Sequence, residues 1–364
     1  MGFWPCSLES MAIDKNFWSG KSVFITGHTG FKGGWLAIWL AKLGAKVYGY
    51  SLMPKTELSF FKEVKLMEQV ASSHIGDIRD LTELTMRLDQ AQPEIVFHMA
   101  AQPLVRESYI APVETFETNV IGTVNLLEAA RKVSSVKAVV NITTDKCYEN
   151  KEWAWPYREN DRLGGFDPYS ASKACAEMVA SAYRHSFYKN MNINTATVRA
   201  GNVIGGGDWS DDRLIPDFLK SIEKNQTLQI RSPNAVRPWQ HVLEPLSGYL
   251  MLAESLVTIG EEFAEPWNFG PTENDAKSVE WIVNALCKHF PDTQYSIDYG
   301  EHPHEAGLLK LDSSKAKTKL GWKPRWKLEK ALFKTIEWHN AWRNNQNMLD
   351  TSISQIEEYE ASIL

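Results

Sequence analysis

The sequence predicts an α/β fold: a doubly wound parallel sheet with a smaller lobe of mixed α/β structure. In the first half of the chain, short apolar runs alternate with helical patterns, which is typical of buried parallel strands joined by helices. After Gly201 this alternation ends, and the remaining segments are shorter, mixed and rich in aromatic residues. We expect them to lie over the carboxyl ends of the strands, where ligands bind in such sheets.

Each expected strand is a short apolar run, and each expected helix is a longer segment with apolar residues at helical spacing. The chain opens with a strand at 21–26 (KSVFIT), a helix at 34–43 (GWLAIWLAKL) and a strand at 46–51 (KVYGYS). The later elements of this half are a helix at 81–90, a strand at 95–99, a helix at 115–133, a strand at 138–143, a helix at 168–188 and a strand at 194–199.

Three glycines directly follow the first strand, in the segment 26–33 (TGHTGFKG). Gly27 permits a tight turn, Gly30 lets the backbone approach a pyrophosphate, and Gly33 allows the helix to pack close to the strand. The free N–H groups at the start of that helix can then hold phosphates. This strand–turn–helix context predicts a Rossmann-type dinucleotide site. The loop residues expected to contact the cofactor are Gly27, His28, Gly30, Phe31, Lys32 and Gly33.

The end of the second strand leaves the choice between NAD and NADP open. An acidic residue there would bind the ribose hydroxyls of NAD, and a basic residue would accommodate the phosphate of NADP. In this chain Ser51 can bond to a ribose and Lys55 can meet a phosphate, and no acid stands at the expected place. Further on, we expect Asp77 to accept from the adenine amino group, with Ile78 against the ring. The alternative is an ordinary acid at a strand end.

Tyr169 and Lys173 are four residues apart and therefore share one face of a helix that Asp167 and Pro168 begin. A free tyrosine, with a pKa of about 10, is a poor base. A neighbouring ammonium and an oxidised nicotinamide both favour the phenolate. Because such pairs are common on solvated helices, the assignment depends on Thr144, whose hydroxyl at the end of a strand can share the substrate's proton.

Together these residues resemble the extended short-chain dehydrogenase/reductase family. The segments 98–101 (HMAA) and 118–123 (TNVIGT) add to the resemblance, which runs from about residue 19 to about 340. It implies Thr144, Tyr169 and Lys173 as the hydride-transfer triad. It also implies that Ala100, Ala101 and Asn119 belong to the cofactor site, together with Tyr169 and Lys173.

Within this family, Asp145 and Lys146 favour the nucleotide-sugar 4,6-dehydratases, because a 4-epimerase has no elimination step to catalyse. Dehydratases of dTDP-glucose and GDP-mannose resemble the chain but have a glutamate where Lys146 stands. This lysine and the segments 199–209, 213–217 and 237–243 resemble the branch that acts on CDP-glucose. The resemblance implies CDP-glucose as substrate and favours NAD. The alternatives are another sugar-nucleotide dehydratase, a 4-epimerase and a nucleotide-binding regulator without turnover.

The resemblance also implies a sequence of proton transfers. Tyr169 takes the proton of the sugar's C4 hydroxyl, which Thr144 orients, while hydride leaves C4. Lys146, if neutral, removes the C5 proton, and Asp145, if protonated, gives a proton to the leaving C6 hydroxyl. A free lysine has a pKa of about 10.4 and is normally charged. The alternative is therefore a charged Lys146 that only stabilises the enolate.

A nucleoside diphosphate needs local cations here, because the chain has a formal net charge of −6. Arg213 and Arg237 offer bidentate forks for phosphate, and Asn202 can bond to a diphosphate oxygen. The expected substrate-binding residues are Arg199, Asn202, Asp208, Trp209, Arg213, Leu214, Arg237, Gln240 and His304. We expect no metal, because the His302-x-His304 pair has no third ligand cluster in the sequence.

The expected lobe boundaries follow the same reasoning. The dinucleotide-binding lobe is expected at 15–203 and 240–262, the substrate lobe at 204–239 and 263–345, and peripheral tails at 1–14 and 346–364. The resemblance implies a homodimer through a four-helix interface formed by helices 115–133 and 168–188, with a tetramer as the alternative. It also suggests a place in deoxysugar synthesis for a cell-surface polysaccharide such as an O-antigen.

The overall composition argues against other classes of protein. The acidic balance does not suggest a nucleic-acid binder, and no apolar run approaches the roughly 20 residues of a membrane span. The four cysteines show neither a CxxC pair nor a disulfide framework, so a reducing cytoplasm is expected. The first residues lack the pattern of a signal peptide.

Overall fold

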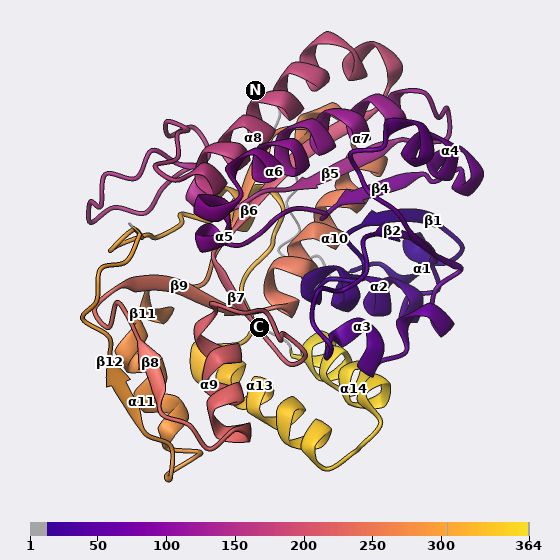
Figure 1. Ribbon diagram of the computed structural model, residues 1–364. Coiled ribbons are helices and arrows are strands. Elements are labelled where there is room, and N and C mark those ends of the chain that lie inside the picture. The colour runs from indigo at the N-terminus through magenta and orange to yellow at the C-terminus, as the bar shows by residue number, and fades with distance from the viewer. Residues whose placement is uncertain (1–12, 304, 363–364) are drawn as a thin grey trace.

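Seven parallel strands form the central sheet of the computed structural model, which describes residues 13–303 and 305–362 (Figure 1). The strand order is β10-β6-β5-β4-β1-β2-β3. The bounds are β1 (Ser22–Thr26), β2 (Lys46–Ser51), β3 (Ser72–Ile75), β4 (Ile95–His98), β5 (Ala138–Ile142), β6 (Asn194–Ala200) and β10 (Pro266–Phe269). From β1 the chain builds the sheet outward in both directions, which confirms the predicted doubly wound fold.

The strands of this sheet supply two separate cores, because successive side chains point to opposite faces. In β1, Val23 and Ile25 pack on one face and Phe24 packs on the other. Helices α2 (Phe31–Lys42) and α10 (Leu243–Thr258) cover the first face, and α4 (Leu81–Ala91), α7 (Gly122–Arg131) and α8 (Pro168–Ser186) cover the second, as Figure 1 shows. Burial on both sides explains why the strands appear in the sequence as uninterrupted apolar runs.

The helix expected at 115–133 is present but not uniform, because the continuous helical segment widens in its middle. Helix α6 (Pro112–Phe116) leads into a π-helical turn, η2 (Glu117–Ile121), before α7 begins. In this turn the Asn119 side chain accepts a hydrogen bond from the Gln102 N–H and donates one to the Ser172 hydroxyl. The widened turn thus serves contacts with the loop after β4 and with α8, which helical spacing in the sequence does not report.

Several segments of the chain beyond β6 form a small lobe, which lies at the lower left of Figure 1. It comprises β7, β8, β9, β11 and β12 with helices α9 and α11. The bounds are β7 (Asn202–Ile204), α9 (Leu214–Glu223), β8 (Leu228–Ile230), β9 (Val236–His241), β11 (Ala276–Ser278), α11 (Val279–Cys287) and β12 (Tyr295–Ile297). A third apolar core, which includes Ile215, Phe218 and Ile282, joins this lobe to α13 (Leu328–Arg343).

Two of the expected boundaries are wrong. The strand β10 falls in the expected substrate lobe, but it pairs with β6 and extends the large sheet. The segment 346–364, expected as a peripheral tail, contains helix α14 (Met348–Ala361), which packs against α2 and α13. Ile356 and Tyr359 of this helix are fully buried. The C-terminal segment is therefore an integral layer beneath α2.

A buried carboxylate on α10 anchors this C-terminal segment. Glu244 accepts hydrogen bonds from the backbone N–H groups of Arg325 and Trp326 and from the hydroxyl of Tyr359. Since a buried carboxylate is costly without donors, these bonds fix the loop before α13 and the end of α14 on the same side chain. One acid on α10 thereby joins three segments that are distant in the sequence.

The remaining elements are short. They are α1 (Lys15–Trp18), α3 (Phe60–Glu63), η1 (Leu66–Glu68), α5 (Val105–Ile110), η3 (Asp145–Cys147), η4 (Tyr188–Met191), η5 (Glu261–Phe263), η6 (Glu273–Asp275) and α12 (Ser314–Lys319). The expected tail at 1–14 lies outside the described residues except for Ile13 and Asp14. Among residues 13–303 and 305–362, no helix has both the length and the apolar content that a membrane span requires.

The position of α14 gives a direct prediction for stability. Replacing Ile356 by Ala should lower the free energy of unfolding by about 2–4 kcal/mol, because it removes buried methyl groups and leaves a cavity beneath α2. Urea denaturation followed by tryptophan fluorescence measures the change. The matched control is Ile259→Ala, since Ile259 is 49% exposed, and it should stay within about 0.5 kcal/mol. Equal effects of the two substitutions would contradict an integral α14.

Candidate active site

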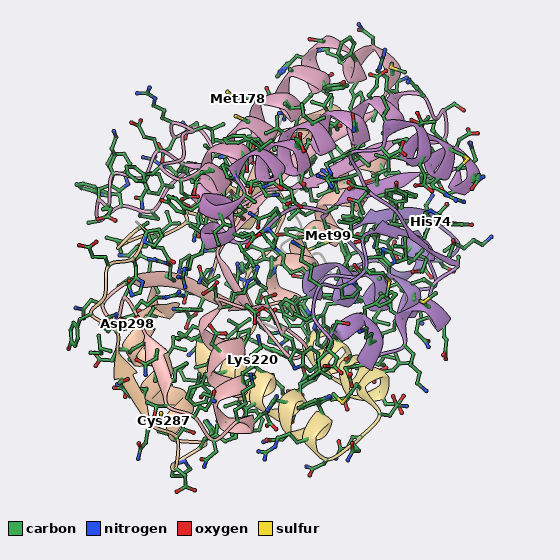
Figure 2. All side chains as sticks on the ribbon, in the orientation of Figure 1. His74, Met99, Met178, Lys220, Cys287 and Asp298 are labelled. Carbon is green, nitrogen blue, oxygen red and sulfur yellow. The ribbon has the colours of Figure 1, made fainter. Side chains whose placement is uncertain are left out.

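A cleft of about 930 Å³ runs along the carboxyl ends of the parallel strands and into the small lobe. Its wall begins at the glycine loop, passes the ends of β4 and β5, and reaches α9 and β8. Met99, labelled near the centre of Figure 2, lies on this wall just after β4. Ligands bind at this edge in open α/β sheets, so the cleft is the candidate site.

The glycine loop fits a dinucleotide at the first end of the cleft. Gly27 has a φ of +78°, and a Cβ atom there would come within 2.6 Å of the Ala100 nitrogen. A Cβ atom at Gly33 would come within 2.1 Å of the Gly27 carbonyl oxygen. Side chains at these positions would therefore push the loop away from β4 or from α2. Gly30, Phe31, Lys32 and Gly33 also line the cleft, as do Ala100 and Ala101.

The residues expected around the adenosine lie at the same end. Ser51 lines the cleft, and its hydroxyl is 2.9 Å from that of Thr29. Asp77 also lines it, but its carboxylate accepts hydrogen bonds from the Arg79 guanidinium, which holds its pKa below the usual range. Ile78 is buried beside Gly122, where a Cβ atom would meet its side chain. Lys55 lines the cleft as well, so the geometry here admits either cofactor.

Two residues expected to contact the cofactor point elsewhere. The His28 side chain is fully buried, with its Nε2 atom 2.7 Å from the Ser73 hydroxyl, and burial lowers its pKa to about 4. It faces the core between α2 and β2, because its neighbour Gly27 turns the chain. Asn119 is buried in the π-helical turn, and Thr118 lines the cleft in its place. Neither side chain is part of the cleft.

The triad expected from the sequence assembles where β5 meets α8. Thr144, Tyr169 and Lys173 all line the cleft and are all buried. Asp167 caps α8 by accepting from the Ser170 N–H at 2.9 Å, which sets Tyr169 in the first turn. The Lys173 ammonium donates to the Ile142 carbonyl at 3.1 Å, and this bond holds the side chain against β5.

Burial governs the proton affinities of this triad. It raises the pKa of Tyr169 to about 12, although the Thr144 hydroxyl and the positive charge of Arg213 oppose the rise. It lowers the pKa of Lys173 to about 8, against the attraction of Glu177. Burial also lowers the pKa of Lys32 to about 7, assisted by the positive charges of Arg213 and Lys173. The cleft therefore favours neutral side chains until a ligand adds charge to it.

Asp145 and Lys146 follow Thr144 in the short helix η3. Asp145 is buried, and its Oδ1 atom accepts from the Thr144 hydroxyl at 3.1 Å. Its Oδ2 atom is buried without a partner among the described residues. Burial raises the pKa of Asp145, and burial followed by the charge of Arg237 lowers the pKa of Lys146. Both shifts favour a protonated acid beside a neutral amine, which is the pairing that an elimination needs.

Most of the expected substrate residues line the far half of the cleft. They are Asn202, Asp208, Trp209, Arg213, Leu214 and Arg237. Arg213 lies 3.2 Å from Asp208, which leaves part of its guanidinium available. Arg237 is buried, and one of its nitrogens donates to the Val236 carbonyl at 3.1 Å. Two guanidinium groups thus face one cleft and can hold a diphosphate.

The expectation that Arg199 and Gln240 bind substrate is wrong. The Arg199 guanidinium makes two hydrogen bonds of 2.8 Å with the Glu177 carboxylate and a third of 2.8 Å with the Tyr148 hydroxyl. It is 2% exposed and does not line the cleft. The Gln240 amide donates to the Phe269 carbonyl inside the protein. His304, the last expected residue, lies outside the described residues.

Several residues to which the sequence assigned no individual role also line the cleft: Thr118, Asp217, Arg231 and Glu305. Asp217 lies in the first turn of α9, four residues after the N-cap residue Arg213, and its backbone N–H donates to the Arg213 carbonyl. That spacing was the available signal. Within the described part of the chain, no group of three or more histidine, cysteine, aspartate or glutamate side chains is placed to hold a metal ion.

Comparison with known proteins places these features in context. The model of the GDP-mannose 4,6 dehydratase family matches residues 24–335. Over 353 residues the chain is 56% identical to the CDP-glucose 4,6-dehydratase of Salmonella typhimurium, covering 95% of this chain and 98% of the relative.

Two solved structures show that the whole fold is shared. The dTDP-glucose 4,6-dehydratase of Bacillus anthracis in complex with NAD has a TM-score of 0.74 at 22% identity, covering 91% of this chain and 100% of that one. The UDP-glucose 4-epimerase of Thermotoga maritima with UDP-glucose has a TM-score of 0.75 at 23% identity, covering 87% and 98%. At these identities the likeness concerns the fold alone.

The pairing of Arg199 with Glu177 predicts a structural role for this arginine. Arg199→Met should lower the free energy of unfolding by about 3–5 kcal/mol, because it leaves a buried carboxylate without its cation. Urea denaturation measures the loss. The double variant Arg199→Met/Glu177→Gln should recover part of it, since no uncompensated charge then remains. A single variant as stable as the wild type but weaker in nucleotide binding would restore the substrate role.

Proposed function

The chain belongs to the GDP-mannose 4,6 dehydratase family, and on this premise we propose that it converts CDP-glucose to CDP-4-keto-6-deoxyglucose and water, with NAD as cofactor. The observation that carries the proposal is the convergence of five groups on one cleft: Thr144, Asp145, Lys146, Tyr169 and Lys173. The 56% identity to a CDP-glucose 4,6-dehydratase supports the nucleotide. We assign the cofactor to the large-sheet half of the cleft and the nucleotide-sugar to the small lobe.

The residues of the first half of the cleft fit the cofactor. The glycine loop and the N-terminus of α2 would hold its pyrophosphate, and Ser51, Asp77 and Ile78 would surround its adenosine. NAD, when bound, accepts hydride from C4 of the sugar and returns it to C6, and its cationic ring adds positive charge beside Tyr169. Net oxidation is therefore zero over one cycle.

The oxidation at C4 requires a base, and Tyr169 supplies it. With a pKa raised to about 12 by burial, Tyr169 loses its proton only when positive charge is close. The Arg213 guanidinium already opposes the rise, and the Lys173 ammonium, one helical turn away, together with the cationic ring of bound NAD would supply the further positive charge. Thr144 orients the C4 oxygen so that its proton can pass to the phenolate. The product of this step is a C4 ketone.

The elimination of water then uses Asp145 and Lys146. The C4 ketone makes the C5 hydrogen acidic, since the resulting carbanion is an enolate, and neutral Lys146 accepts that proton. The protonated carboxyl of Asp145 gives its proton to the C6 hydroxyl, which leaves as water. When C6 is reduced, Lys146 returns its proton to C5. The proton taken up by Tyr169 balances the one that Asp145 gives away.

The proposal extends to assembly and location. Helices α6, α7 and α8, with the turn η2, leave Val113, Phe116, Ile121 and Met178 exposed, and Figure 2 shows Met178 on the outer side of α8. An exposed apolar surface of this kind supports a homodimer formed through these helices, as implied by the family. We place the enzyme in the cytoplasm, where it would supply a deoxysugar for a cell-surface polysaccharide.

The decisive experiment is turnover. The purified protein is incubated with NAD and CDP-glucose, and the 4-keto-6-deoxy sugar is detected by its absorbance in alkali. UDP-glucose, dTDP-glucose and GDP-mannose run in parallel. We expect product from CDP-glucose in clear excess over the other three. Recovery of a C4 epimer, or of unchanged sugar in every case, would overturn the proposed function.

The role of Lys146 gives a second prediction. Lys146→Met should reduce product formation by about 10²–10⁴-fold, because it removes the base that takes the C5 proton. In D₂O the wild-type product carries deuterium at C5, whereas the variant should oxidise C4, accumulate reduced cofactor and leave C5 unlabelled. Mass spectrometry and cofactor absorbance measure both.

The matched control is Lys151→Met, five residues further along the chain. Lys151 is exposed and pairs with Glu149, so its loss should leave labelling and turnover unchanged. Rapid deuterium uptake at C5 by the Lys146→Met variant would rule out Lys146 as the base and leave it a stabiliser of the enolate.

A further inference from the structure

The end of the cleft within the small lobe has an apolar wall, and the carboxylate of Asp217 lies beside it. Leu219, Leu228, Ile230 and Val279 line this end and provide flat, apolar surface. Asp217, in the first turn of α9, lines the same end. Figure 2 labels Lys220, which lies one turn further along this helix. An acid among apolar side chains is unexpected in a cleft that must take up an anion.

The carboxylate of Asp217 has no partner of its own. Among the described residues, no hydrogen bond or ion pair reaches its side chain, although its backbone N–H donates to the Arg213 carbonyl. The nearest cations are engaged by other acids: Lys220 with Asp211 at 2.5 Å and Arg231 with Asp212 at 3.1 Å. The side chain is half-buried, and this burial raises its pKa to about 6. A donor from a ligand would relieve the unfavourable burial of its charge.

The neighbouring arginines decide which part of a ligand can supply that donor. Arg213 and Arg237 hold the place where a diphosphate is stabilised, and a carboxylate facing phosphate would be repelled. Asp217 lies one helical turn beyond Arg213, about 6 Å along α9 and further into the small lobe. The group that faces it is therefore the base at the end of the nucleotide, lying against the apolar wall.

We propose that Asp217 selects cytosine by accepting a hydrogen bond from its 4-amino group. This inference rests on the proposed function, because it takes the ligand to be a pyrimidine nucleoside diphosphate sugar. Cytosine presents an N–H donor at position 4, whereas uracil and thymine present a carbonyl oxygen there. A carboxylate opposite that oxygen would set two acceptors against each other and leave both without a donor. Asp217 thus favours CDP and rejects UDP and dTDP.

The expected discrimination is about 10- to 100-fold in dissociation constant, the range that one specific base contact provides. Calorimetric titration of CDP and of UDP into the NAD-saturated protein measures it without any turnover. Asp217→Asn is the informative variant, because its amide can accept from cytosine or, when rotated, donate to the carbonyl oxygen of uracil. It should bind CDP more weakly and UDP more tightly than the wild type, so that the ratio falls at least about 10-fold. A gain in UDP affinity cannot arise from misfolding.

Two further variants complete the test. Asp217→Glu keeps the charge and should keep the preference for CDP. Asp298→Asn changes an acid of the small lobe that pairs with His302 and does not line the cleft, and it should leave the ratio unchanged. A wild-type protein that binds CDP and UDP equally, or an Asp217→Asn variant whose ratio stays within twofold of the wild type, would overturn the inference.

The test of cytosine recognition by Asp217 can be distinguished from the test of the proposed reaction. If the ratio changes as expected but no nucleotide-sugar is dehydrated, Asp217 reads the base and the proposed function fails. If CDP-glucose is dehydrated but the Asp217→Asn variant discriminates as before, the proposed function stands and the base is read by other groups.

Discussion

The carboxylate of Glu177 fixes the catalytic helix to the sheet. Besides its two bonds with Arg199 of β6, it accepts from the hydroxyls of Thr143 and Thr197 at 2.5 and 2.6 Å. Glu177 is one turn beyond Lys173 on α8, and Thr143 directly precedes Thr144. A single buried side chain thereby sets the distance between the helix that carries the tyrosine and lysine and the strand that carries the threonine. The alignment of the triad depends on this constraint.

Burying the Glu177 carboxylate costs free energy, and this cost explains the polar groups around it. A buried carboxylate is tolerated only when donors satisfy both oxygens, and here four donor groups do so, two of them hydroxyls on neighbouring strands. Tyr148 adds a further bond to Arg199 and stacks under its guanidinium. The Arg199 guanidinium is therefore engaged by structural contacts with Glu177 and Tyr148. Under the proposed function, the diphosphate is therefore assigned to Arg213 and Arg237, which line the cleft.

Features that depend on the local sequence pattern could be predicted, whereas features that depend on contacts between residues distant in the sequence could not. Strands β1, β4 and β5 appear as apolar runs because both faces are buried, and Tyr169 and Lys173 share a face because of their spacing. The π-helical turn at Asn119 is accompanied by contacts with Gln102 and Ser172, which no periodicity reports. His28 and Arg199 were misassigned because a motif gives a residue's position in the chain and not the direction of its side chain. Asp217 stands in the segment 213–217 that carries the resemblance but received no role of its own, because its distinguishing property, a carboxylate without a partner among the described residues, exists only in the folded protein.

In the cleft, burial affects the pKa values of Asp145 and Lys146 more strongly than the neighbouring charges do. Asp145 and Lys146 attract each other, and that attraction alone would make both charged. Desolvation is larger for each, and it raises the pKa of the acid and lowers that of the amine. The positive charge of Arg237 acts in the same direction as desolvation on Lys146, because it disfavours a second cation nearby. Under the proposed function, the arginine assigned to the diphosphate and the lysine assigned to the C5 proton are therefore parts of one electrostatic arrangement, because the guanidinium charge favours the neutral amine.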